Sequence, residues 1–338
     1  MFATYLGQVS AGESLDFEGM RGAVDLIMQG AVPDGQIGLF LTALREKGET
    51  VPEIAGAAAA LRQHMTPIRT SRTDLVDTCG TGGGGSKKFN ISTAAAIVAA
   101  AAGCAVAKHG NRSITSKTGS ADVLSELGVN IMASAPTVER CLDELGICFC
   151  FAPLLHPAMK RVADIRRQLG VPTIFNLLGP LANPANAPYH LLGVSKPHLR
   201  NTLAEALGLL KTKRAVVMYG DDGLDEITLA GATQGTLTED GKQSEFAWTP
   251  ADFGLHVQSL ESLIVDGPAQ SAAIIRRILD GEKGTARDIV VANAAGAIWT
   301  AQKVDTVKHG AELAAEAIDS GEAKRVLARL GELTNRSA

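Results

Sequence analysis

The chain has 338 residues, 46% of them hydrophobic and 20% charged, so it is long enough for two domains that each bury a core. Its net charge of −4 gives no electrostatic argument for a nucleic acid or a membrane as the main partner. Five scattered cysteines without a Cys-x-x-Cys pair argue against a zinc knuckle or a dithiol redox site, and predict buried free thiols.

Residues 1–70 are predicted to be entirely helical. Apolar residues recur at helical spacing over 17–29 and 37–47, and Pro33 stands near the start of the second of these helices. A further helix is expected over 52–64. We therefore expect a small all-helical domain at the start of the chain.

From residue 74 onward, short apolar runs alternate with helical stretches, which is typical of a mainly parallel sheet covered by helices. The predicted strands are 75–76, 104–107, 129–132, 148–151, 189–194, 214–219 and 227–229. Helices are predicted over 94–102, 269–279, 287–301 and 304–320, with a small antiparallel excursion over 233–253. Segment 156–184 looks helical and proline-punctuated, and we expect it near a hinge. The predicted fold class is α/β, with a helical domain (1–70, joined by 156–184) and a larger α/β domain (71–155 and 185–338).

A run of five glycines within residues 80–85 follows the first predicted strand and precedes an alanine-rich helix. Glycines at such a turn let backbone N–H groups close on an anion, and the helix N-terminus adds positive potential. Asn90, Ser92 and Thr93 add side-chain donors, so the run predicts a phosphate or pyrophosphate site. The dinucleotide fingerprint fits poorly because residues 98–110 contain no acidic residue, and no Gly-Lys-Ser/Thr follows as a P-loop requires. A purely structural turn is the alternative interpretation.

Two more polar blocks follow the next predicted strand. Lys108-His109-Gly110-Asn111-Arg112 stands at its end, where ligands bind in open α/β sheets, although an ordinary polar loop has the same composition. The hydroxyls of residues 116–122, Ser120 among them, either cap a helix or hold a phosphate oxygen.

The last two blocks carry charge. Asp225 and Glu226 end an acidic loop, and adjacent carboxylates predict a Mg²⁺ site unless the loop is simply a solvated turn. Arg166 precedes the stiff segment Gly179-Pro180-Leu-Ala-Asn-Pro184 and could pair with a substrate carboxylate. A surface helix followed by a proline-capped turn is the alternative.

Together these five blocks, with residues 36–50, resemble the anthranilate phosphoribosyltransferase family, in the class with nucleoside-phosphorylase-like architecture, over nearly the whole chain. The resemblance implies transfer of a phosphoribosyl group from 5-phosphoribosyl 1-pyrophosphate to the amine of anthranilate, with release of pyrophosphate. It also implies two Mg²⁺ ions per subunit and a homodimer formed through the helical domain. Because no leader or long apolar run is seen in the sequence, we expect a cytoplasmic enzyme.

Site residues are carried over from the family motifs position by position. Phosphoribosyl pyrophosphate would be bound by Gly80, Thr81, Gly82, Gly83, Asn90, Ser92, Thr93, Lys108 and Ser120, with Ser86, Lys88 and Gly110 also counted as substrate-binding. Anthranilate would contact Asn111 and Arg166, in a channel lined by His109, Gly179 and Pro180. Asp225 and Glu226 would hold Mg²⁺, with Ser92 near a second ion. No covalent nucleophile is assigned. Lys108, Asn111 and Arg166 are expected to position the substrates and to stabilise charge.

One departure from the family pattern lies in the glycine run. Gly84 stands where the family usually carries Asp, and Lys88 stands where a small hydroxyl residue is common, so the loop is less negative. The change predicts weaker binding of one Mg²⁺ ion. Competing interpretations are a pyrimidine nucleoside phosphorylase-like enzyme and a non-catalytic nucleic-acid-binding paralogue. The net charge of −4 and the intact Asp225-Glu226 pair disfavour the second of these.

Overall fold

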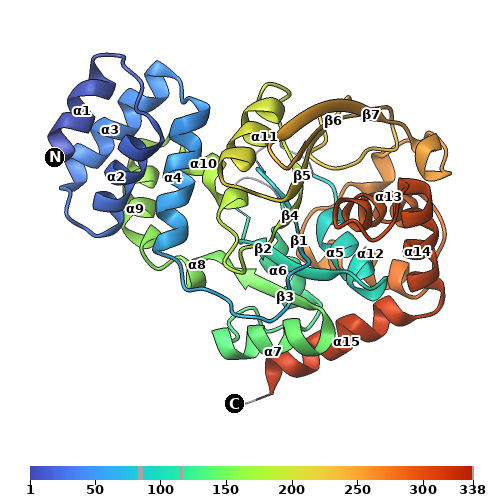
Figure 1. Ribbon diagram of the computed structural model, residues 1–338. Helices are drawn as coiled ribbons and strands as arrows, with labels where there is room; N and C mark the ends of the chain where they lie inside the picture. Colours follow the sequence, from blue (N-terminus) through green and yellow to red (C-terminus); the bar gives the residue numbers. More distant parts are fainter. Residues whose placement is uncertain (83–86, 114–116, 337–338) are drawn as a thin grey trace.

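The computed structural model describes residues 1–82, 87–113 and 117–336. Figure 1 shows a helical block at one end of the molecule and a sheet flanked by helices at the other. Within the described ranges, no helix is both long and apolar enough to cross a membrane. The two-part α/β architecture predicted from the sequence is confirmed; the exact division at residue 70 remains our proposal.

The helical block consists of four N-terminal helices and two that return later in the chain. They are α1 (Phe2–Ser10), α2 (Phe17–Met28), α3 (Asp34–Lys47), α4 (Val51–Gln63), α9 (Met159–Leu169) and α10 (Phe175–Leu178). A capping box of Thr50 and Glu53 starts α4. The fully buried Glu53 also accepts hydrogen bonds from Leu15 N at 3.0 Å and Lys47 Nζ at 2.8 Å, which ties three segments of the block together.

The central sheet has seven strands in the order β3-β2-β1-β4-β5-β6-β7. They are β1 (Leu75–Gly80), β2 (Ala105–Gly110), β3 (Ile147–Phe151), β4 (Tyr189–Gly193), β5 (Arg214–Gly220), β6 (Thr233–Glu239) and β7 (Lys242–Trp248). The first five in spatial order pair in parallel, whereas β6 and β7 add antiparallel strands at one edge. Both the mainly parallel sheet and the antiparallel excursion were predicted correctly.

Helices cover both faces of the sheet. Alternate strand residues face opposite layers. Leu191 and Val216 join the core under α5 (Ile91–Ala101) and α13 (Thr285–Thr300), while Leu192 and Val217 join a core shared with α11 (Leu199–Leu209) and the helical block. The second core therefore runs without a break from the helical block into the sheet. The remaining elements are α6 (Ser120–Glu126), α7 (Ala135–Leu145), α8 (Ala152–Leu155), η1 (Gly179–Leu181), η2 (Pro250–Phe253), η3 (Glu261–Leu263), α12 (Pro268–Leu279), α14 (Val307–Asp319) and α15 (Glu322–Asn335).

The predicted strand over 129–132 is wrong. Val129 and Ile131 are buried, whereas Met132 is exposed, and the backbone closes the end of α6 through a bond from Val129 N to Leu124 O at 2.9 Å. Asn130 N then donates to Thr334 Oγ1 of α15 at 3.1 Å. Because these backbone groups already serve a helix end and a side chain, they cannot join a ladder.

The predicted strand over 227–229 is also wrong. Ile227 N donates to the Asn293 side chain at 2.9 Å, and Thr228 N donates to the Thr233 hydroxyl at 3.0 Å. Side chains thus take the place of a neighbouring strand, and the segment is a loop. All five cysteines are free, as expected, and all except the half-buried Cys79 are buried.

Candidate active site

The candidate site lies where four parallel strands end. Gly80, Gly110, Gly193 and Gly220 are the last residues of β1, β2, β4 and β5. Since parallel strands share a polarity, the loops that follow these residues meet at one edge of the sheet. The N-terminus of α5 faces the same edge, so the expected phosphate cradle and the acidic loop are brought together.

The glycine loop leaves β1 in a fixed direction. Thr81 N donates to Gly193 O at 2.9 Å, and Thr81 Oγ1 accepts from Ser195 N at 3.3 Å, so the loop start is bonded to the end of β4. Gly82 is exposed and has φ of 63°, a left-handed conformation that favours glycine. The predicted residues Gly83 and Ser86, and the unusual Gly84, lie outside the described residues.

The end of the same loop carries further predicted residues. Lys88 is half-buried and forms an isolated β-bridge with Ile264. The Asn90 side chain bonds to Thr118 and Ser271. Thr93, in the first turn of α5, is only 1% exposed, so it lies beneath the loop surface.

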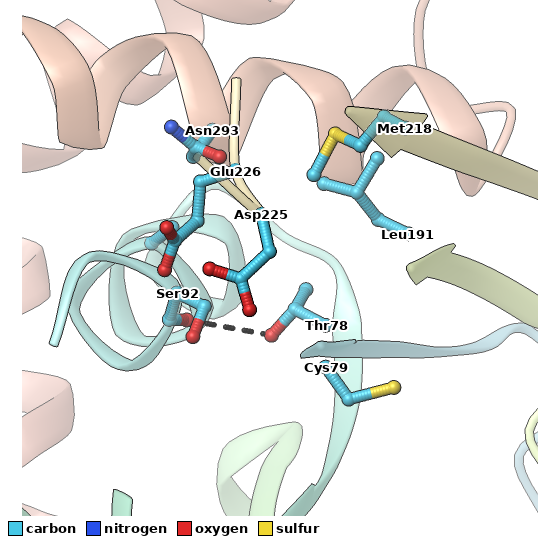
Figure 2. Close-up of a pocket in the computed structure, with 9 residues that line it drawn as sticks. Thr78, Cys79, Ser92, Leu191, Met218, Asp225, Glu226 and Asn293 are labelled. Atoms are coloured by element: carbon cyan, nitrogen blue, oxygen red, sulfur yellow. Dashed lines mark hydrogen bonds between the residues drawn. The ribbon is translucent and has the colours of Figure 1, made fainter. Parts of the chain in front are cut away.

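The acidic pair faces α5 and β1 across a small hollow. Figure 2 shows the carboxylates of Asp225 and Glu226 pointing toward Ser92 and Thr78. Burial raises the pKa of Asp225, and burial together with the Asp225 charge raises the pKa of Glu226 well above its ordinary value. Two carboxylates and a hydroxyl form a set of hard oxygen donors, and a divalent cation would relieve both desolvation and repulsion. The residues therefore fit the Mg²⁺ that the sequence predicts.

Asn293 of α13 holds the acidic pair in place, and no sequence pattern pointed to it. This buried amide accepts from Ile227 N at 2.9 Å and donates to Ile227 O at 2.9 Å, directly after Glu226. A third bond, to Ile289 O at 2.8 Å, anchors the amide to its own helix. The backbone that carries Glu226 is therefore clamped to α13.

A buried charged layer lies beneath the loops. Lys108 is 4% exposed; its ammonium group donates to Thr78 O and lies 3.5 Å from Ser92 Oγ. Burial lowers the pKa of Lys108, against the opposing effects of Asp77, Cys79 and Glu226. Asp77, fully buried, accepts from His109 N at 3.1 Å, so it fixes the end of β2. The Lys108 amine is thus held in a fixed position next to Ser92.

His109 joins the end of β2 to the proline-rich segment. Its Nδ1 lies 3.0 Å from Gly179 O, and its ring centre lies 5.1 Å from that of His156. Burial lowers the pKa of His109 to about 3 and that of His156 to about 4. Among the described residues, His109 Nε2 has no hydrogen-bond partner. The sequence did not single out His156, whose proximity to His109 depends on the fold.

We expect His109 to contribute no inflection to the pH profile of turnover between about pH 5 and pH 8, because its imidazole stays neutral there. The folded pKa lies below the ordinary value, so the stability that the neutral ring supports is complete above about 6.5 and is lost as the pH falls toward 3. His109→Gln keeps a neutral donor. Its turnover should stay in a constant ratio to the parent across this range, and its free energy of unfolding should fall less steeply in acid. An inflection near pH 6.5 that disappears in the variant would contradict the assignment.

The remaining predicted residues come from several different elements of the chain. Asn111 is exposed and its carbonyl accepts from Ser120 Oγ at 3.3 Å. Arg166 Nη2 donates to Asn176 Oδ1 at 3.1 Å, and burial lowers the pKa of Arg166. Pro180 is buried. No hydrogen bond joins Arg166 to Asn111 within the described part of the chain.

Comparison with known proteins places this site in a family. Residues 72–324 match the a/b domain of a glycosyl transferase family, and residues 3–65 match its helical bundle domain. Relatives named anthranilate phosphoribosyltransferase, from Rhodopirellula baltica and Symbiobacterium thermophilum, are each 49% identical over 98% of this chain and 97% of their own.

Solved structures agree with this placement. The anthranilate phosphoribosyltransferase of Thermus thermophilus has a TM-score of 0.92 and 42% identity, and the match covers 98% of this chain and 99% of that one. The Saccharomyces cerevisiae enzyme, solved in complex with PRPP and Mg, has a TM-score of 0.89 and 29% identity, with 98% and 97% covered. The chain therefore belongs to this glycosyl transferase family, and within it to the anthranilate phosphoribosyltransferases.

Proposed function

We propose that the protein transfers the phosphoribosyl group of 5-phosphoribosyl 1-pyrophosphate to the amine of anthranilate, a step of tryptophan biosynthesis, and releases pyrophosphate. The observation that carries the proposal is the convergence of the acidic pair, Ser92 and the start of α5 at the end of β1, where the glycine loop begins. A loop of backbone donors beside a divalent-cation site suits a pyrophosphate group. The 49% identity to named relatives supports the same substrates.

Phosphoribosyl pyrophosphate is assigned to the edge formed by β1, α5 and β2. The assigned residues are Gly80, Thr81, Gly82, Gly83, Ser86, Lys88, Asn90, Ser92, Thr93, Lys108, Gly110 and Ser120. Breaking the bond from the anomeric carbon to pyrophosphate leaves positive charge on the ribose and negative charge on the leaving group. Backbone N–H groups of the loop and the Lys108 ammonium group stabilise that negative charge without reorganising.

Anthranilate is assigned to the side of the site that faces the helical block. Asn111 and Arg166 contact its polar groups, and His109, Gly179 and Pro180 line its approach. We add His156 to this lining, because its ring lies beside that of His109, with the two ring planes tilted by 45°, and it is 6% exposed. A neutral His109 suits an uncharged aromatic amine, whose lone pair is already available for attack.

The chain's own residues thus act by binding, orientation and exclusion of water rather than by covalent catalysis. Movement of the helical block about segment 156–184 would close the site and protect the activated ribose from hydrolysis. Arg62 of α4 donates to Leu181 O at 2.7 Å, so the block is already bonded to the segment that carries Gly179.

We propose two Mg²⁺ ions, one held by Asp225 and Glu226 and one near Ser92. When bound, they supply positive charge to the leaving pyrophosphate. Gly84 removes a carboxylate that the family usually has in this loop, so Gly84→Asp is expected to lower the Mg²⁺ concentration that gives half-maximal turnover. Superimposable Mg²⁺ titrations of the parent and the variant would rule this out.

The proposed reaction is tested by mixing the protein with anthranilate, phosphoribosyl pyrophosphate and Mg²⁺. Loss of anthranilate fluorescence, with pyrophosphate released in equal amount, is the expected result. Phosphorolysis of thymidine would favour the nucleoside phosphorylase alternative. Salt-dependent retention on a nucleic-acid column without turnover would favour the non-catalytic alternative.

Two further expectations complete the proposal. A homodimer formed through the helical block is proposed because the family resemblance implies it; on that block, Leu39 of α3 is 63% exposed. Sedimentation equilibrium measures the mass directly, and a monomer at all concentrations would refute it. A cytoplasmic location is proposed as well; fractionation of cells that express the chain would test it.

A further inference from the structure

Ser271 of α12 is a fully buried hydroxyl that reaches into the candidate site from a distant part of the chain. Its Oγ donates to Asn90 Oδ1 at 2.8 Å and accepts from Asn90 N at 3.0 Å. These residues are 181 positions apart. One hydroxyl therefore fixes both the backbone and the side chain of Asn90, at the last position before α5.

A second hydroxyl completes the arrangement. Thr118 Oγ1 donates to the same Asn90 Oδ1 at 2.8 Å, so two donors occupy the two lone pairs of that oxygen. This decides which side of the amide is oxygen. The Nδ2 group donates one hydrogen to Thr118 O at 3.3 Å and has a second hydrogen to give. The amide is thus held with its donor side defined.

The anchor is not isolated. The stretch before α12 runs alongside the exit of the glycine loop, where Phe89 N donates to Leu263 O at 2.9 Å and Val265 N donates to Lys87 O at 2.8 Å. Helix α12 also packs against α6, which follows the loop that contains Thr118 (Figure 1). Two loops of the site are therefore tied to one helix through Asn90.

We propose that Ser271 is a positioning residue for phosphoribosyl pyrophosphate, acting with Thr118 to fix the Asn90 amide so that its NH₂ group meets a phosphate oxygen. The inference rests on the proposed function, in which Asn90 binds that substrate. Ser271 touches no substrate itself. Replacing Ser271 should therefore weaken binding of phosphoribosyl pyrophosphate only while the Asn90 side chain is present.

A double-mutant cycle tests this dependence. Ser271→Ala should raise KM for phosphoribosyl pyrophosphate about tenfold, as expected for a hydrogen bond to a charged group, and leave KM for anthranilate within about twofold. In an Asn90→Ala background the same substitution should change KM less than about twofold. An equal effect in both backgrounds would assign Ser271 a purely structural role and overturn the proposal.

Two matched pairs of variants separate the loss of the hydrogen bond from a loss of folding. Thr118→Val keeps the side-chain shape but removes the donor and should act like Ser271→Ala, whereas Thr118→Ser should resemble the parent. Ser125→Ala removes a hydroxyl that donates within α6, to Ala121 O at 2.9 Å, and should change nothing. If Ser271→Ala does not fold, a parent-like KM for Thr118→Val overturns the proposal.

The two proposals fail in different ways. Should the parent show no turnover with anthranilate, the proposed function fails, and the cycle is then read from the shift in unfolding temperature on adding phosphoribosyl pyrophosphate and Mg²⁺. That shift should shrink for Ser271→Ala but not for Ser125→Ala. A parent that turns over normally while Ser271→Ala retains the parental KM overturns only the role of Ser271.

Discussion

Replacing both carboxylates of the acidic pair, Asp225→Asn with Glu226→Gln, is expected to lower turnover at least about 100-fold and to raise the unfolding temperature. The loss follows because these oxygens are the proposed ligands of a cation that stabilises the leaving pyrophosphate. The gain follows because burial raises the pKa of both groups, which means that their charged forms are costly in the folded protein. Activity and stability should therefore move in opposite directions.

The same acidic loop offers a matched control. Asp221 and Asp222 are exposed, and the double change Asp221→Asn with Asp222→Asn alters net charge equally without touching the hollow. The control should keep turnover within about twofold, as exposed substitutions away from such features usually do. Adding Mg²⁺ with pyrophosphate should raise the unfolding temperature of the parent and the control but not of the Asp225–Glu226 variant. Equal turnover in the two double variants, or equal protection, would contradict the assignment.

Short-range patterns were enough to predict the sheet and most of its helices. The buried strands β2 and β3 read as apolar runs because both of their faces are covered, and α5 is apolar all round for the same reason. The two wrong strands, over 129–132 and 227–229, have similar composition. Their backbone groups bond to Thr334 and Asn293, and no local sequence pattern predicts those partners.

The residues of the candidate site also fall into those that the local sequence predicts and those that only the fold brings together. The acidic pair and the glycine loop could be predicted because each is a run of adjacent residues whose chemistry is evident from composition. Asn293 and Ser271 could not, because they act on residues 66 and 181 positions away and only the fold makes them neighbours. The resemblance to a family supplied direct substrate contacts but not the residues that hold those contacts in place.

The second large effect is expected from a single methyl group at the end of β4. A Cβ at Gly193 would lie 1.6 Å from the carbonyl oxygen of Asp225 and 2.5 Å from its carbonyl carbon. The acidic loop therefore rests directly on this glycine. We expect Gly193→Ala to push the loop away by about an ångström or more and to lower turnover about 100-fold, because catalysis is that sensitive to misplacement.

Overpacking at this position should also destabilise the fold by about 1–3 kcal/mol, so folding must be measured separately. Gly231→Ala is the matched control at the far end of the same loop, where the nearest atom to an added methyl is Asp221 Cβ at 3.9 Å. It should retain parental turnover. The decisive measurement is the rise in unfolding temperature on adding Mg²⁺ with pyrophosphate. Gly193→Ala should be folded before heating but should show much less of this rise than the parent. Full protection in Gly193→Ala would mean that the acidic loop tolerates displacement, and that its contact with β4 does not set the geometry of the cation site.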